Sequence, residues 1–144
     1  MSTEAVKEIV VKAPPTKVFP YLIDPDLMVQ WLGSEVSSNP VPGGELRVLC
    51  GGNPGLGEFL EIVTNEKVVF TFGWTAPGHP IPAGSTEVEI SLTPKGDDTL
   101  VRLTHRGLPE DAIADHNSGW GFYLGRLEKV MSGIDPGPDM NSHD

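Results

Sequence analysis

The sequence has 144 residues, a length that normally folds as one compact domain. Acidic residues number 20 against 10 lysines and arginines, and the net charge of -10 argues against binding to nucleic acids or anionic membranes. Cys50 is the only cysteine, which excludes an internal disulfide, and charged residues near the N-terminus interrupt any secretory signal. We therefore expect a cytoplasmic protein that folds without a metal and needs no cofactor.

One short strand followed by two short helices is predicted for the N-terminal part. Residues 6–12 contain a β-branched run that a pair of prolines stops. Residues 16–22 place apolar side chains at helical spacing. An Asp-Pro pair then starts a second helix, which ends near Gly33.

A meander of antiparallel strands is predicted for the central part of the chain. Segments that alternate apolar and polar residues are separated by clusters of Gly, Pro, Asn and Asp. The predicted strands are residues 46–50, 57–63, 68–74, 85–93 and 99–106. In the last of them, His105 shares the inward face with Val101 and Leu103. Residues 75–84 are rich in proline and glycine and are predicted to form a long loop.

A long amphipathic helix is predicted to close the domain. A proline and two acidic residues mark its start after Leu108. One apolar stripe then runs to Gly133, made of Ile113, His116, Trp120, Leu124, Leu127 and Met131. Residues 134–144 have little to bury, so we expect a single domain over residues 1–133 and a disordered tail over residues 134–144.

The order of these elements predicts an α+β fold. A curved antiparallel sheet of about six strands wraps around the long C-terminal helix, with two short helices after the first strand. The helix is the element available to cover the concave face of the sheet, and we expect an apolar cavity between the two. Such cavities are typical sites for small ligands.

Several segments resemble a known family. They are VVKAPPTKVFPYLIDPDLMVQW at residues 10–31, PVPGGELRV at 40–48, GLGEFLEIVTNEKVVFTFGW at 55–74, STEVEISLTPKGDDTLVRLTHRGLP at 85–109 and HNSGWGFYLGRLEKVMSG at 116–133. Together they resemble the C-terminal domain of the activator of the 90-kilodalton heat-shock protein ATPase. That family belongs to the START-like (SRPBCC, birch-pollen-allergen-like) superfamily.

The resemblance implies a helix-grip fold with a deep cavity between the sheet and the last helix. Members of the superfamily bind lipids, sterols or polyketides, act as cyclases or hydrolases, or activate chaperones, so the fold alone does not select one activity. The eukaryotic activators also carry an N-terminal chaperone-binding domain, for which this sequence has no room. This difference weakens the expectation of co-chaperone activity.

Two histidines are the weak catalytic candidates of the sequence. His105, at the inner face of a strand, could act as a general acid or base at the cavity wall, and His116 could face it from the helix. The alternative for His105 is a core histidine bonded to a backbone carbonyl or to a helix side chain. Two histidines without a third ligand do not predict a metal site.

Large apolar residues from separate segments are predicted to converge on the cavity. Aromatic side chains in such positions either line a ligand pocket or simply pack in the core. The predicted ligand-binding residues are Trp31, Phe59, Phe72, Trp74, His105, His116, Trp120 and Leu124.

The remaining polar and reactive residues give weaker signals. Arg47 could pair with Glu58 or Glu61 inside the cavity, or all three could lie on the solvated outer face. Cys50 alternates with Val48 and is predicted to be a small buried side chain. Because the glycine-rich segment after Cys50 lacks the Gly-Lys-Ser/Thr ending of a phosphate loop, nucleotide chemistry is not expected.

Three hypotheses for function follow. The first is a module that binds a small apolar or aromatic ligand, lipid-like or polyketide-like. The second is a stress-response protein that acts on a chaperone or another protein, with the loop at residues 75–84 as its contact surface. The third is a cyclase- or hydrolase-type enzyme that uses His105 or His116 as a general base. The protein could act as a monomer or as a homodimer.

Overall fold

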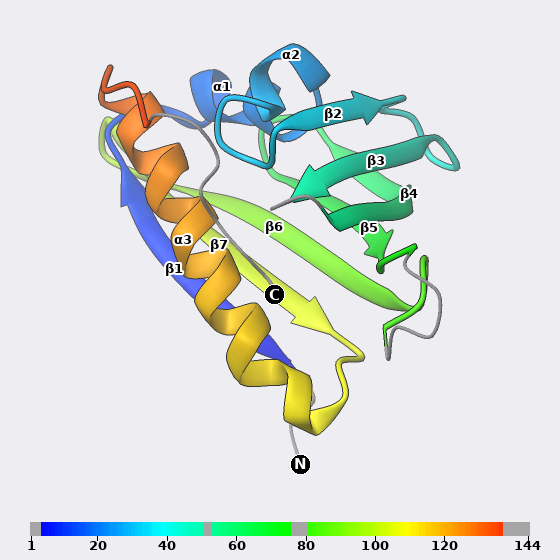
Figure 1. Cartoon of the computed structure of the whole chain (residues 1–144). Coiled ribbons are helices and arrows are strands. Elements are labelled where there is room, and N and C mark those ends of the chain that lie inside the picture. Colours follow the sequence, from blue (N-terminus) through cyan, green and yellow to red (C-terminus); the bar gives the residue numbers. More distant parts are fainter. Residues whose placement is uncertain (1–3, 51–52, 76–80, 137–144) are drawn as a thin grey trace.

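A seven-stranded sheet, antiparallel throughout, forms the body of the molecule (Figure 1). The computed structural model describes residues 4–50, 53–75 and 81–136. The strands follow the spatial order β1-β7-β6-β5-β4-β3-β2. Their bounds are β1 Ala5–Val11, β2 Glu35–Ser38, β3 Glu45–Cys50, β4 Asn53–Val63, β5 Lys67–Phe72, β6 Thr86–Lys95 and β7 Asp98–Arg106.

Short helices connect β1 to β2, and one long helix follows β7. The long helix α3 packs against β1, with its N-terminal end beside the end of β7 and its C-terminal end near α1 (Figure 1). No helix in the described ranges is long and apolar enough to cross a membrane. The bounds are α1 Pro15–Val18, η1 Phe19–Leu22, α2 Pro25–Met28, η2 Glu110–Ala112 and α3 Ile113–Met131.

Period-two alternation along the strands builds one continuous core. Over residues 86–92 of β6 and 99–103 of β7 every second side chain is buried, because the other face of the sheet is in water. The α3 side chains that complete the core are Trp120, Tyr123, Leu124 and Leu127. The predicted helix-grip arrangement is therefore confirmed.

The outer face of the sheet carries ion pairs. Arg106 contacts three carboxylates, with Glu4 at 3.2 Å, Glu87 at 3.1 Å and Glu89 at 2.9 Å. These salt bridges are partly exposed, so each contributes little to stability.

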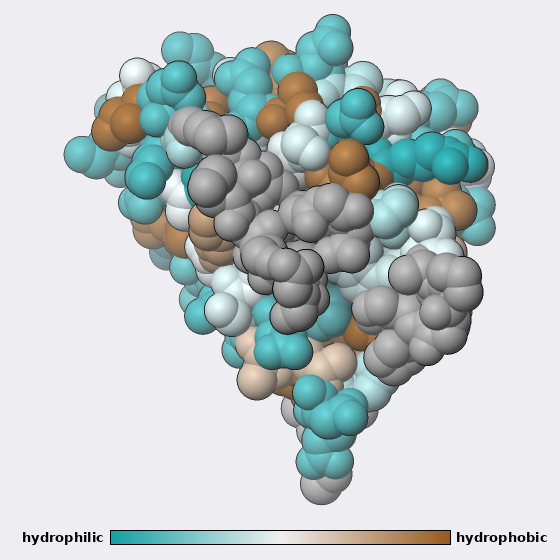
Figure 2. Space-filling view, viewed as in Figure 1, coloured by the Kyte–Doolittle hydropathy of each residue, from teal (hydrophilic) through white to brown (hydrophobic). Residues whose placement is uncertain are grey.

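Hydrophobic and hydrophilic side chains are mixed over the surface. On the face of the molecule seen in Figure 2, hydrophobic side chains form small areas among hydrophilic ones.

The sheet has one strand more than expected. The additional strand, β2, contains a single apolar residue, Val36, and pairs on one side only, with β3. Four residues with one apolar position give too little alternation to predict a strand. Strand β4 also begins earlier than expected, at Asn53, because the segment predicted as a turn pairs with β3 through Cys50.

Glycine allows β4 to pass close to β5. A Cβ atom on Gly57 would overlap the carbonyl group of Thr71, and one on Gly55 would overlap the ring of Phe72. Gly55, predicted to be in a turn, and Gly57, predicted to begin a strand, are therefore both sites of close strand contact.

Three expectations concern residues outside the described ranges. The tail is described only to Pro136, so the predicted disorder of residues 137–144 is untested. Residues 76–80 of the predicted contact loop are likewise outside these ranges, whereas Ile81, at its end, is buried in the core. The side chain of Cys50 also falls outside the part that the structure describes.

Candidate functional site

His105 lies at the centre of a buried hydrogen-bond chain that links the sheet to α3. Its side chain is fully buried. The indole Nε1–H of Trp120 donates to His105 Nδ1 over 3.0 Å. On the other side of the ring, Nε2 lies 2.7 Å from Thr86 Oγ1, and that hydroxyl donates to the carbonyl of Phe72 over 2.6 Å.

These contacts assign the proton on the imidazole. An indole N–H can only donate, so His105 Nδ1 must accept. The neutral ring therefore carries its proton on Nε2 and donates it to Thr86, whose own proton goes to the Phe72 carbonyl. Every donor in this chain points in one direction, from α3 toward β5.

Burial keeps His105 uncharged. Desolvation, together with the nearby His116, lowers the pKa of His105 from 6.5 to about 3. Both ring nitrogens are occupied, and neither can reach a substrate without breaking the chain of hydrogen bonds. These contacts are those of a core histidine bonded to a helix side chain rather than those of a general base.

His116 joins the same cluster from α3. Its ring centroid lies 5.2 Å from that of His105 in an edge-to-face arrangement. Trp74 Nε1–H donates to His116 Nε2 over 3.4 Å, so Nδ1 carries the proton and donates to the Ala112 carbonyl over 3.0 Å. The structure thus brings together His116, Trp74 and His105, as the sequence predicted for the two histidines.

Aromatic rings extend this cluster along β5. Phe72 makes edge-to-face contacts with Trp74, at 5.2 Å between centroids, and with His105, at 6.2 Å. Phe59 joins through Phe70, at 6.0 Å. These phenylalanines, Trp74 and His105 are at least nine-tenths buried, whereas His116 is partly exposed at the margin of the cluster.

The remaining predicted ligand-binding residues lie farther along the core. Trp31 is fully buried and donates its indole N–H to the Tyr21 carbonyl over 2.8 Å. Its own carbonyl accepts from Arg126, near the C-terminal end of α3. Leu124 is also fully buried, on the inner stripe of α3. The expected convergence of three tryptophans therefore holds for Trp74 and Trp120, whereas Trp31 packs at the other end of the helix.

Of the two alternatives for Arg47, Glu58 and Glu61, the structure shows the solvated outer face. Arg47 is exposed and bonds Glu45, two residues away on the same strand, over 2.6 Å. Glu61 pairs instead with Lys67 over 3.2 Å, and Glu58 is exposed. Alternation places Glu45 and Arg47 of β3 on the solvated face. In β4 a register shift between Phe59 and Glu61 leaves both Glu58 and Glu61 exposed.

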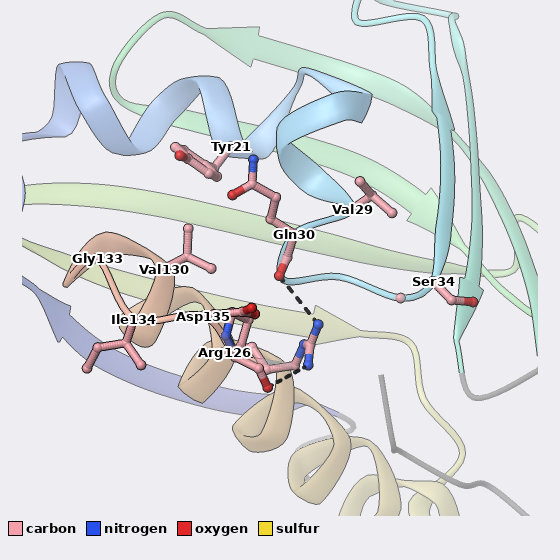
Figure 3. Close-up of a pocket in the computed structure, with 11 residues that line it drawn as sticks. Tyr21, Val29, Gln30, Ser34, Arg126, Val130, Gly133, Ile134 and Asp135 are labelled. Atoms are coloured by element: carbon pink, nitrogen blue, oxygen red, sulfur yellow. Dashed lines mark hydrogen bonds between the residues drawn. The ribbon is translucent and has the colours of Figure 1, made fainter. Parts of the chain in front are cut away.

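A pocket of about 620 Å³ opens between the short helices and the C-terminal end of α3 (Figure 3). Its walls combine apolar and polar groups. None of the predicted ligand-binding residues lines this pocket. The lining residues come from η1, from the segment after α2, and from α3 and the chain that follows it. They are Tyr21, Val29, Gln30, Gly33, Ser34, Arg126, Val130, Gly133, Ile134, Asp135 and Pro136.

Arg126 and Asp135 are the charged residues in the wall of this pocket, and Arg126 is the one that reaches across it. Its side chain is only 6% exposed. Nε donates to the Trp31 carbonyl over 3.1 Å, Nη2 to the Gln30 carbonyl over 3.4 Å and Nη1 to the Pro136 carbonyl over 3.4 Å. Figure 3 shows the guanidinium reaching from α3 toward the segment that carries Gln30.

The sequence analysis missed this residue. An arginine in an amphipathic helix is usually a solvated neighbour of the apolar stripe. The available signal was spacing, because Tyr123, Arg126 and Val130 recur at intervals of three and four and so share one flank of the buried stripe. Two of its carbonyl partners, those of Gln30 and Trp31, are almost a hundred positions away, which spacing does not reveal.

The curved antiparallel sheet and the long C-terminal helix make this chain a helix-grip domain. Residues 12–132 match the family described as activator of Hsp90 ATPase homolog 1-like protein. The chain therefore belongs to this family. Among curated proteins no match is found.

Solved structures share this fold. The AHSA1-like protein from Rhizobium etli is 39% identical with a TM-score of 0.71, and the match covers 100% of this chain and 91% of that one. DynU16, a protein of the dynemicin biosynthetic locus, is 22% identical with a TM-score of 0.81, over 96% of this chain. The match spans only 51% of DynU16, about half its length. An HSP90 activator from Plasmodium falciparum is 21% identical with a TM-score of 0.74, over 91% of this chain and 96% of that one.

Proposed function

We propose that this protein is a module that binds a small molecule in the pocket between the short helices and the end of α3. The observation that carries the proposal is the pocket itself. Its volume of about 620 Å³ lies within the range usual for ligand sites. Its walls hold apolar surface from Val29 and Val130 beside polar groups from Gln30 and Ser34. This combination favours a ligand with an apolar body and a polar end.

The aromatic cluster around His105 has a different role in this proposal. Apart from His116, which is partly exposed, its side chains are closed off from water and its polar atoms bond one another, so a ligand there would have to displace packed rings. The cluster instead fixes the N-terminal half of α3 against the sheet. A rigid frame of this kind supports a preformed pocket at the other end of the helix.

A pocket-filling substitution tests the proposal. Val130 lines the pocket, and its neighbour Lys129 is exposed and does not. We expect the wild type to bind the neutral fluorescent probe N-phenyl-1-naphthylamine, Val130→Trp to lose that binding, and Lys129→Trp to retain it. Circular dichroism checks that both variants stay folded. Wild-type protein that binds no such probe and carries no ligand in native mass spectrometry would sink the proposal.

A second candidate function rests on family membership. The family is named for activation of a chaperone ATPase, and one structure with this fold is an HSP90 activator. A chaperone-linked role would use the surface rather than the pocket. Purified 90-kilodalton chaperone provides the test, since a partner of this class changes its ATPase rate. If Val130→Trp binds the chaperone as tightly as the wild type does, the chaperone-linked role is separate from ligand binding in the pocket.

A further inference from the structure

One buried guanidinium connects three parts of the pocket wall. Arg126 comes from α3, two of its acceptors are the Gln30 and Trp31 carbonyls after α2, and the third is the Pro136 carbonyl after α3. Because the side chain is only 6% exposed, its position is fixed by these contacts rather than by solvent. Gln30 and Pro136 themselves line the pocket.

We propose that Arg126 is the positioning residue of the binding pocket and sets the separation of its two walls. This inference rests on the proposed binding function and names the residue on which ligand affinity depends. Over the described residues 31–34 and 134–136, the two segments form no helix or strand that would fix their distance. The hydrogen bonds of Arg126 hold both segments to the same rigid helix.

The chemistry of the side chain explains why arginine fits this place. A guanidinium is planar and presents its N–H groups in a fixed fork, so it can hold carbonyls that lie in different directions. The ring of Phe122, one turn earlier on α3, lies 5.9 Å from the guanidinium carbon and adds a cation–π contact. A lysine has a single charged nitrogen and cannot reach all three acceptors at once.

Matched substitutions test the role. Arg126→Lys keeps the charge and Arg126→Met keeps an unbranched apolar stem, whereas both lose the fork. We expect each to weaken binding of N-phenyl-1-naphthylamine at least about tenfold, because hydrogen bonds of a charged donor are lost from the wall. Arg102→Met is the control. It removes the same charge from an exposed ion pair with Glu8 on the sheet and should leave affinity unchanged.

Chemical rescue separates positioning from general stability. Arg126→Ala leaves a space of guanidinium shape, and millimolar guanidinium chloride, well below denaturing concentrations, should restore probe binding in this variant and not in Val130→Trp. Unchanged affinity in Arg126→Lys and Arg126→Met would overturn the inference. The inference would equally be overturned if the affinity of the Arg126 variants for the probe fell only in proportion to their melting temperatures and guanidinium chloride restored no binding. Absence of probe binding by the wild type would instead defeat the proposed function.

Discussion

The environment of His105 predicts a specific dependence of stability on pH. The folded protein holds this imidazole neutral because burial lowers its pKa to about 3, whereas an unfolded chain has the ordinary value of 6.5. Between these two values the unfolded state binds a proton that the folded state does not. Stability is therefore fully present above pH 6.5 and is lost as the pH falls toward 3.

The size of the effect follows from proton linkage. At pH 5 the unfolded imidazole is almost fully protonated, and the free energy of unfolding falls by about 2 kcal/mol relative to pH 8. This value hardly depends on the exact folded pKa, because the buried ring is neutral at pH 5 for any value near 3. The loss grows by about 1.4 kcal/mol for each further pH unit.

The contribution of His105 is measured by urea unfolding of the wild type and of His105→Gln. Unfolding is followed by tryptophan fluorescence at pH 8, 7, 6 and 5, and the two pH profiles are compared. The glutamine variant has lower absolute stability but lacks this titration. Carboxylates and histidines that do not contact His105 contribute equally to both proteins and cancel in the comparison. We expect the wild type to lose about 2 kcal/mol more than the variant between pH 8 and pH 5. Parallel pH profiles would refute the assignment of a neutral, sealed imidazole.

Further predictions concern packing and surface charge, each measured by urea unfolding. Gly125→Ala in α3 should stabilise by about 0.5–1 kcal/mol, because nothing lies within 4 Å of the added Cβ. Gly57→Ala should cost more than about 3 kcal/mol, since a backbone carbonyl occupies that space; a loss as small as that of a surface change would contradict the strand contact. Thr86→Val should cost about 2 kcal/mol and Thr86→Ser much less, because only the hydroxyl bridges two buried groups. Arg106→Ala should cost less than about 1 kcal/mol despite its three carboxylate partners, and a larger loss would mean that this outer network acts cooperatively.

The period of the sequence pattern was sufficient to predict most of the fold. Strand alternation placed His105 inward with Val101 and Leu103, and the structure buries all three. The three-to-four spacing of the last helix likewise predicted Trp120 and Leu124 as core residues. Burial of one face is a local property of a strand or helix, so it leaves a signal in neighbouring residues.

Features that depend on distant segments left no such signal. Strand β2 has one apolar residue and is defined by its pairing with β3. The pocket forms where residues 21–34 meet residues 126–136, and its volume follows from their relative position. Alternation predicted that Arg47 lies on one face of its strand, but its choice of Glu45 as a partner depends on side-chain reach along the sheet edge.

The long helix is attached to the rest of the protein by two kinds of bond. Toward its first turns, indole and imidazole groups connect it to the sheet. Toward its last turns, one buried guanidinium connects it to carbonyls of irregular chain. Amide exchange should therefore be slow in the helix beside both attachments and faster in the irregular segments that the guanidinium holds. Any adjustment that admits a guest molecule would then be confined to those segments, while the helix keeps its place.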